Sequence, residues 1–141
     1  MMVGALLGIA GLIYLVLGTL HAVFTLLDER NPRRLAPDDP AVFAAMQASK
    51  MKLSRGATTM WEAWISFNLT HSLAAILMGT ACLIVMAHLG LFVFSPWALA
   101  ALAGVSGVFA LIGLRYWFGI PRAGTLIATG ALTAAWLLYA V

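Results

Sequence analysis

The residues of this chain that could do chemistry lie in one apolar stretch, TMWEAWISFNLTHSLAAILMG, at positions 59–79. It carries Glu62, Asn68 and His71, and an ionisable group at the centre of a membrane span costs about 2.5 to 3.5 kcal/mol on insertion scales. A second imidazole, His21, lies in the preceding apolar run. Because histidine exchanges protons near neutral pH and ligates metals, these residues are the first candidates for a functional site.

Helical spacing divides the polar residues of this stretch between two faces. At about 100° per residue, Asn68 and His71 share one face with the indoles of Trp61 and Trp64, whereas Glu62 lies on nearly the opposite face. Glu62 and His71 therefore do not form a dyad on one helix surface. A helix that is polar on two sides must contact protein or water on both, which predicts that this span lies at the centre of a bundle.

The first apolar run has a polar stripe of its own. Tyr14, Gly18, His21, Thr25 and Asp28 follow one another at helical intervals. Within this stripe Tyr14 offers a phenol, and Gly18 leaves space beside the imidazole of His21. The sequence does not specify which helix this stripe faces.

Four predicted transmembrane helices carry these side chains. The 141-residue chain is 63% hydrophobic and 9% charged, with a mean hydropathy of +1.00, outside the range of soluble domains. Its apolar runs cover about residues 3–27, 57–87, 92–114 and 119–140, and each is long enough to cross about 30 Å of hydrocarbon as a helix. We therefore expect one transmembrane domain over residues 1–141, an all-α integral membrane four-helix bundle.

Small residues predict how these helices meet. Gly4 and Gly8 form a GxxxG match in the first run and Gly11 follows, while Gly104 and Gly107 recur in the third run. Such residues let helix backbones approach closely within a membrane.

The first loop, residues 28–56, contains most of the charges and a predicted short amphipathic helix. Asp39 is a suitable N-cap and Pro40 a suitable first helical residue. The apolar side of this helix would consist of Val42, Phe43, Met46 and Met51. A helix of this kind is expected to lie along the membrane surface.

Basic residues set the expected orientation. All eight fall in or beside the first and third loops: Arg30, Arg33, Arg34, Lys50, Lys52, Arg55, Arg115 and Arg122. Because these loops share a side in a four-span chain, the positive-inside rule predicts that both are cytoplasmic and both termini are outside the cytoplasm. The polar cluster then lies in the cytoplasmic leaflet.

Each candidate residue has a structural interpretation beside the functional one. Glu62 lies close enough to the expected interface to pair with Arg55, Arg115 or Arg122, which is an alternative to proton transfer or ligand binding. His21 and His71 could form an interhelical hydrogen bond instead of acting as bases or ligands. The indoles of Trp61 and Trp64 are typical of an interfacial aromatic belt, or they could form the wall of a ligand pocket.

One family resemblance rests on the segments NPRRLAPDDPAVFAAMQAS and TTMWEAWISFNLTHSL. Over about Leu20 to Leu73, the chain resembles a family of small, uncharacterised bacterial membrane proteins with four predicted spans. The matching positions are occupied by His21, Trp61, Trp64, Asn68 and His71. The resemblance implies a bacterial inner-membrane location and the same choice of residues, but no activity. A looser similarity to DoxX-type proteins rests on size and span count alone.

Ligand binding is the favoured function. In this hypothesis a lipid or quinone enters between the helices and meets His21, Asn68 and His71, with Trp61 and Trp64 beside it, or the chain serves as an accessory membrane protein. The partners would then be the lipid bilayer, a lipophilic small molecule, and a second copy or a membrane complex. Nucleic-acid binding is not expected, because no basic stripe with interleaved aromatic residues follows a soluble element.

Three alternatives stay open. In a small membrane enzyme, His71 or His21 would act as the base, Glu62 as the acid, and Arg122 would hold an anionic head group. In a b-type haem protein, His21 and His71 would ligate the iron, which is the one metal role expected here. In a complex-assembly subunit the polar residues would be structural. The lone Cys82 supports neither a disulfide nor a thiolate metal site.

The predicted orientation has a direct test. A reporter domain that is active only after export should be active when it is fused to either terminus, because the basic loops hold the opposite side of the chain in the cytoplasm. A reporter that is active only in the cytoplasm should be inactive at both termini. Cytoplasmic reporter activity at either terminus would contradict this orientation.

Overall fold

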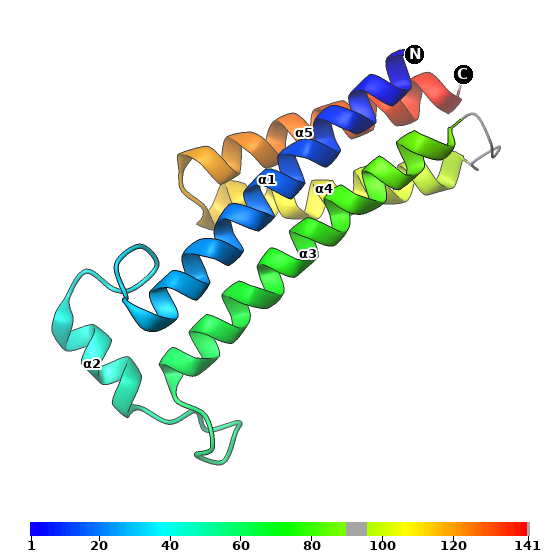
Figure 1. The fold of residues 1–141 in the computed structure, drawn as a ribbon. Helices are drawn as coiled ribbons and strands as arrows, with labels where there is room; N and C mark the ends of the chain where they lie inside the picture. Colours follow the sequence, from blue (N-terminus) through cyan, green and yellow to red (C-terminus); the bar gives the residue numbers. More distant parts are fainter. Residues whose placement is uncertain (90–95, 141) are drawn as a thin grey trace. The chain divides into compact units, whose positions relative to one another are not determined.

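The computed structural model describes residues 1–89 and 96–140, and these residues are all-α. Figure 1 shows the five helices of the described ranges: α1 (Met2–Arg30), α2 (Pro40–Ala48), α3 (Met60–His88), α4 (Pro96–Tyr116) and α5 (Gly119–Ala140). Of these, α1, α3, α4 and α5 are each long and apolar enough to cross a membrane. The predicted all-α architecture with a short helix in the first loop is confirmed. The start predicted for the third span, near Phe92, lies outside the described residues.

The chain divides into two compact units. The first unit, here called the bundle unit, comprises Met1–Leu17 and Ala75–Val141, and the second, the loop unit, comprises Gly18–Ala74. The bundle unit contains the first part of α1, the last part of α3, and all of α4 and α5. The loop unit contains the last part of α1, the first part of α3, and the connection that carries α2.

In the bundle unit, small residues bring α1 against α3. A Cβ atom added to Gly79 would lie 2.7 Å from the carbonyl oxygen of Gly11 and 2.8 Å from the backbone nitrogen of Leu15. Only a glycine permits backbones to approach so closely. Gly11 therefore packs as predicted. Gly104 and Gly107, by contrast, have no atom within 4 Å of an added Cβ, so these glycines of α4 do not mediate the predicted close packing within the described residues.

Three hydroxyl groups connect α1, α4 and α5 inside the bundle unit. The phenol of Tyr14 and the hydroxyl of Ser106 share a hydrogen bond of 2.7 Å, and Ser106 shares another of 2.7 Å with the hydroxyl of Thr129. Tyr14 and Ser106 are almost completely buried. Since a buried hydroxyl without a partner is costly in an apolar interior, this chain of hydroxyls constrains how the three helices meet. The phenol of Tyr14 therefore has its hydrogen-bond partner inside the core of the bundle unit.

In the loop unit, Asp28 closes the turn that follows α1. Its Oδ2 accepts hydrogen bonds from the backbone N–H groups of Arg34 and Leu35, the former at 2.7 Å. Asp28 is fully buried, and its Oδ1 lies 3.9 Å from the guanidinium of Arg34. That guanidinium is also 5.2 Å from the ring centroid of Phe24. One carboxylate therefore shapes the chain between α1 and α2.

The loop helix α2 begins as predicted and ends earlier. Asp39 is its N-cap, accepting a hydrogen bond of 2.7 Å from the N–H of Ala41, and Pro40 is its first residue. The helix ends at Ala48. Our prediction that Met51 belongs to its apolar side is therefore wrong. Instead, the N–H of Met51 donates to the carbonyl of Thr58 at 2.9 Å, since the chain turns back there to enter α3.

The contact between Gly11 and Gly79 predicts a steric effect. Gly79→Ala should lower the free energy of unfolding by about 1–3 kcal/mol, because the new methyl group would meet backbone atoms that cannot rotate away. Gly107→Ala is the matched control, with open space around its Cβ, and should be neutral or stabilising. Thermal unfolding in detergent measures both. Equal midpoints for the two variants would contradict the close approach.

Candidate functional site

The two histidines of the apolar helices meet in the loop unit. His21 of α1 and His71 of α3 stack edge to face, with ring centroids 5.5 Å apart and planes at 76°. Nε2 of His21 also lies 2.8 Å from Oδ1 of Asn68 on α3. Asn68 is 8% exposed, and both imidazoles are partly buried. The site therefore consists of three polar side chains on two apolar helices.

The hydrogen bonds of Asn68 determine what His21 can do. Nδ2 of Asn68 donates to the carbonyl oxygen of Trp64 at 2.7 Å, which leaves its Oδ1 to face His21. Since a carbonyl oxygen only accepts, Nε2 of His21 must carry the proton. A neutral His21 then has its lone pair on Nδ1, where it can accept a hydrogen bond or a proton.

Hydroxyls beside the site bond to their own helices. Thr25 donates to the carbonyl of His21 at 2.8 Å, and Ser72 donates to the carbonyl of Asn68 at the same distance. Both residues are buried. Such bonds satisfy a hydroxyl inside an apolar helix without a partner on another element. The imidazoles are thus the groups at this site whose chemistry suits a ligand.

A chain of hydrogen bonds connects the site to the first loop. The indole N–H of Trp64 donates to the carbonyl of Leu35 at 3.0 Å, and the N–H of Leu35 donates to Asp28. Through Trp64 and Asn68, the loop is therefore linked to His21. The sequence placed Asp28 on the same stripe as His21 but gave no signal for Leu35, because a backbone carbonyl is available at every residue.

Glu62 has a local partner instead of the arginine that we predicted. The N–H of Thr59 donates to its Oε2 at 2.6 Å, while the N–H of Glu62 donates to the hydroxyl of Thr59 at 3.1 Å. This reciprocal pair is a capping box at the start of α3. In the described residues, the ion pair present is that of Arg34 with Asp28. The spacing of TMWE would have revealed the capping box, since Thr and Glu three residues apart are its signature.

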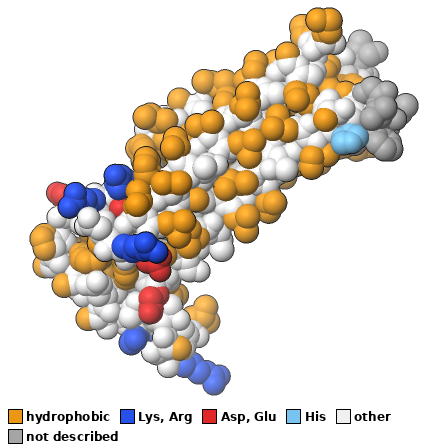
Figure 2. Space-filling view, viewed as in Figure 1, with side chains coloured by type: hydrophobic (Ala, Val, Ile, Leu, Met, Phe, Trp, Pro, Cys, Tyr) orange, Lys and Arg blue, Asp and Glu red, His pale blue; other side chains and the backbone are white. Residues whose placement is uncertain are grey.

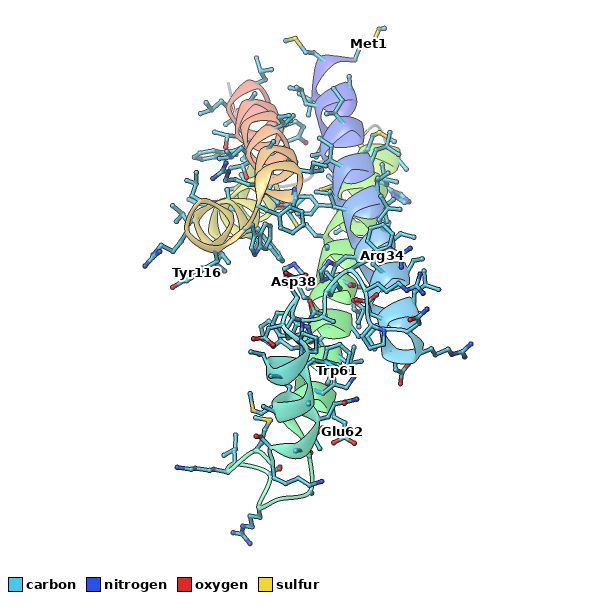
Figure 3. All side chains as sticks on the ribbon, turned by 90° about the vertical axis from the view of Figure 1, so that its left-hand side faces the viewer. Met1, Arg34, Asp38, Trp61, Glu62 and Tyr116 are labelled. Atoms are coloured by element: carbon cyan, nitrogen blue, oxygen red, sulfur yellow. The ribbon has the colours of Figure 1, made fainter. Side chains whose placement is uncertain are left out.

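Trp61 packs against the loop helix α2, and Arg122 belongs to the bundle unit. The ring of Trp61 packs edge to face on Phe43 of α2, with centroids 4.9 Å apart and planes at 88°. Figure 3 labels Trp61 and Glu62 on the first turn of α3. Arg122 is exposed near the start of α5 in the bundle unit, so its role as a ligand for an anionic head group stays a prediction.

The imidazole geometry does not fit a haem between the two rings. Iron ligated by both histidines needs a nitrogen of each aimed at one point, with the macrocycle separating them. Here the rings are in direct contact and Nε2 of His21 is engaged by Asn68. In residues 1–89 and 96–140, no group of three or more His, Cys, Asp or Glu side chains is arranged to hold a metal ion.

The fold defines a small multi-pass membrane protein, with four long apolar helices in the part of the chain that the structure describes. No family model matches the chain, and neither a curated protein nor a solved structure shows significant similarity to it. The resemblance to small bacterial four-span proteins therefore stays a prediction. What the site does must be argued from its own residues.

The bond between His21 and Asn68 predicts a measurable coupling. In a double-mutant cycle with His21→Ala and Asn68→Ala, the interaction energy should be about 0.5–1.5 kcal/mol, because each single substitution leaves the other polar group without its partner. The free energy of unfolding in detergent provides the four values. The control cycle pairs His88→Ala with Asn68→Ala and should be additive, since the two residues are about 30 Å apart along the axis of α3. Additivity in both cycles would contradict the bond.

Proposed function

We propose that the protein binds a lipophilic ligand with an oxygen-bearing head group at the pair His21 and His71. The observation that carries the proposal is the contact of the two imidazoles, with His21 oriented by Asn68 on helices apolar enough to cross a membrane. Imidazoles in such helices are costly to insert, and their placement marks functional sites by default. Orientation by a hydrogen-bonded partner is the arrangement expected of a pre-organised binding group.

Among lipophilic ligands, a quinone best matches this donor and acceptor set. Its carbonyl oxygens accept hydrogen bonds, and the hydroxyls of its reduced form donate them. Nδ1 of His21 can accept a hydrogen bond from such a hydroxyl, because Nε2 of His21 carries the proton that bonds to Asn68. Trp64 is 40% exposed and belongs to the same hydrogen-bonded chain, which supports a role beside a flat ring.

The proposal includes a location. All eight basic residues fall in or beside the first and third loops, and the positive-inside rule assigns that side to the cytoplasm. The ligand would therefore bind in the cytoplasmic leaflet of a bacterial inner membrane. From there a quinone or lipid reaches the imidazoles by diffusing within the bilayer.

Ligand binding is better supported than acid–base catalysis by a His and Glu pair. Glu62 and His71 are nine residues apart on α3, which directs them to nearly opposite sides of the helix. Both bonds of the capping box also engage Glu62 with Thr59.

The proposal predicts a loss of quinone binding in His71→Ala. Affinity of the nanodisc-embedded protein for a short-chain benzoquinone should fall about tenfold, the equivalent of one lost hydrogen bond to a desolvated group. Isothermal titration calorimetry measures this affinity. His88→Ala is the matched control, because it removes the imidazole that lies 2.8 Å from the carbonyl of Ile84 in the last turn of α3. If the wild-type protein binds no quinone and retains no lipophile on purification, the accessory or structural role is favoured instead.

A further inference from the structure

A groove of about 360 Å³ lies in the loop unit beside the first turns of α3. One wall follows the row Trp61, Ile65 and Leu69, whose spacing of four residues forms a continuous apolar ridge on the helix. Ser66 contributes a small side chain, which leaves room beside the ridge. The remaining wall includes Glu29 from the last turn of α1. The groove thus has a long apolar side within helices that can cross a membrane.

Two carboxylates stand where the groove reaches the ends of its helices. Glu29 belongs to the last turn of α1, and Glu62 to the first turn of α3. Both are exposed, and within the described parts of the chain neither lies within 4.0 Å of a lysine or arginine nitrogen. Figure 2 shows acidic and basic side chains together in the part of the view that holds α2 in Figure 1. The groove therefore has two carboxylates among its lining residues and an apolar ridge along α3.

We propose that this groove binds a membrane lipid with a primary ammonium head group, such as phosphatidylethanolamine. The ammonium group would donate hydrogen bonds to Glu29 and Glu62, and an acyl chain would follow Ile65 and Leu69. Charge-assisted hydrogen bonds to carboxylates are about twice as strong as neutral ones. The indole of Trp61 adds the attraction of an aromatic ring for a cation.

The lipid is a better occupant than a simple cation for two reasons. The apolar ridge matches a chain, and it begins at the interfacial end of the helices, where a head group lies when its chain enters the hydrocarbon. A cation is also available for the phosphate. The backbone of Lys50 pairs with that of Thr59, the partner of Glu62, so the ammonium of Lys50 belongs to the same end of the loop unit.

The groove is separate from the proposed ligand site. Its lining residues include neither His21, Asn68 nor His71. On α3, Glu62 lies about 180° from His71, so the two sites use different faces of one helix. The inference therefore goes beyond the proposed function and does not depend on it.

Native mass spectrometry of the full chain released from nanodiscs tests the inference. In nanodiscs that contain both lipids, the protein should retain phosphatidylethanolamine in preference to phosphatidylcholine, because a quaternary ammonium has no N–H to donate. Retention should fall about tenfold or more in the double variant Glu29→Gln and Glu62→Gln, which loses two charge-assisted bonds. The substitution Glu62→Gln keeps the cap of α3, since glutamine also serves in a capping box.

Two control variants accompany this measurement. Asp38→Asn removes an exposed charge from the same loop outside the groove lining and should retain the lipid. Ser66→Phe should fill the groove and expel the lipid while both carboxylates remain. Circular dichroism verifies that each variant is folded.

Three results would overturn the inference. They are equal retention of phosphatidylcholine, undiminished retention in the folded double variant, and binding of decylamine without retention of phosphatidylethanolamine, which would assign the groove to free amines. His71→Ala should leave lipid retention unchanged while it lowers quinone affinity. Failure of the lipid inference and failure of the quinone proposal are therefore distinguishable.

Discussion

The hydrogen bond between His21 and Asn68 is the interaction on which the loop unit depends. An unpaired polar group on an apolar helix is costly, and each of these two side chains finds a partner on the other helix. Because Asn68 also bonds to the carbonyl of Trp64, its amide can face His21 in only one way. The proton position on His21 follows from that orientation.

The same constraint extends from the helices into the first loop. Trp64 bonds to Leu35, and the N–H of Leu35 bonds to Asp28 in the last turns of α1. The segment between α1 and α2 is thereby tied to both α1 and α3. Since the links run through backbone atoms as well as side chains, a change in the loop can alter the position of Trp64 and, through it, Asn68.

In the bundle unit, smaller groups form the contacts between the apolar helices. Gly11 and Gly79 let α1 and α3 approach until backbone atoms are almost in contact, and the hydroxyls of Tyr14, Ser106 and Thr129 satisfy one another across three helices. In the loop unit, α1 and α3 instead contact each other through the imidazoles of His21 and His71.

The sequence by itself determined the four apolar helices, the cap at Asp39, and the choice of His21, Asn68 and His71 as the residues to examine. These features are local or periodic, so composition and helical spacing are enough to reveal them. Even the bond of Glu62 to Thr59 was readable from the TMWE spacing, although we predicted an arginine partner. Only the tertiary structure decided that the two imidazoles touch, that Leu35 accepts from Trp64, and that α2 ends at Ala48. Those contacts depend on how far each helix is rotated and shifted along its axis against its neighbour, and no periodicity within a single helix specifies that.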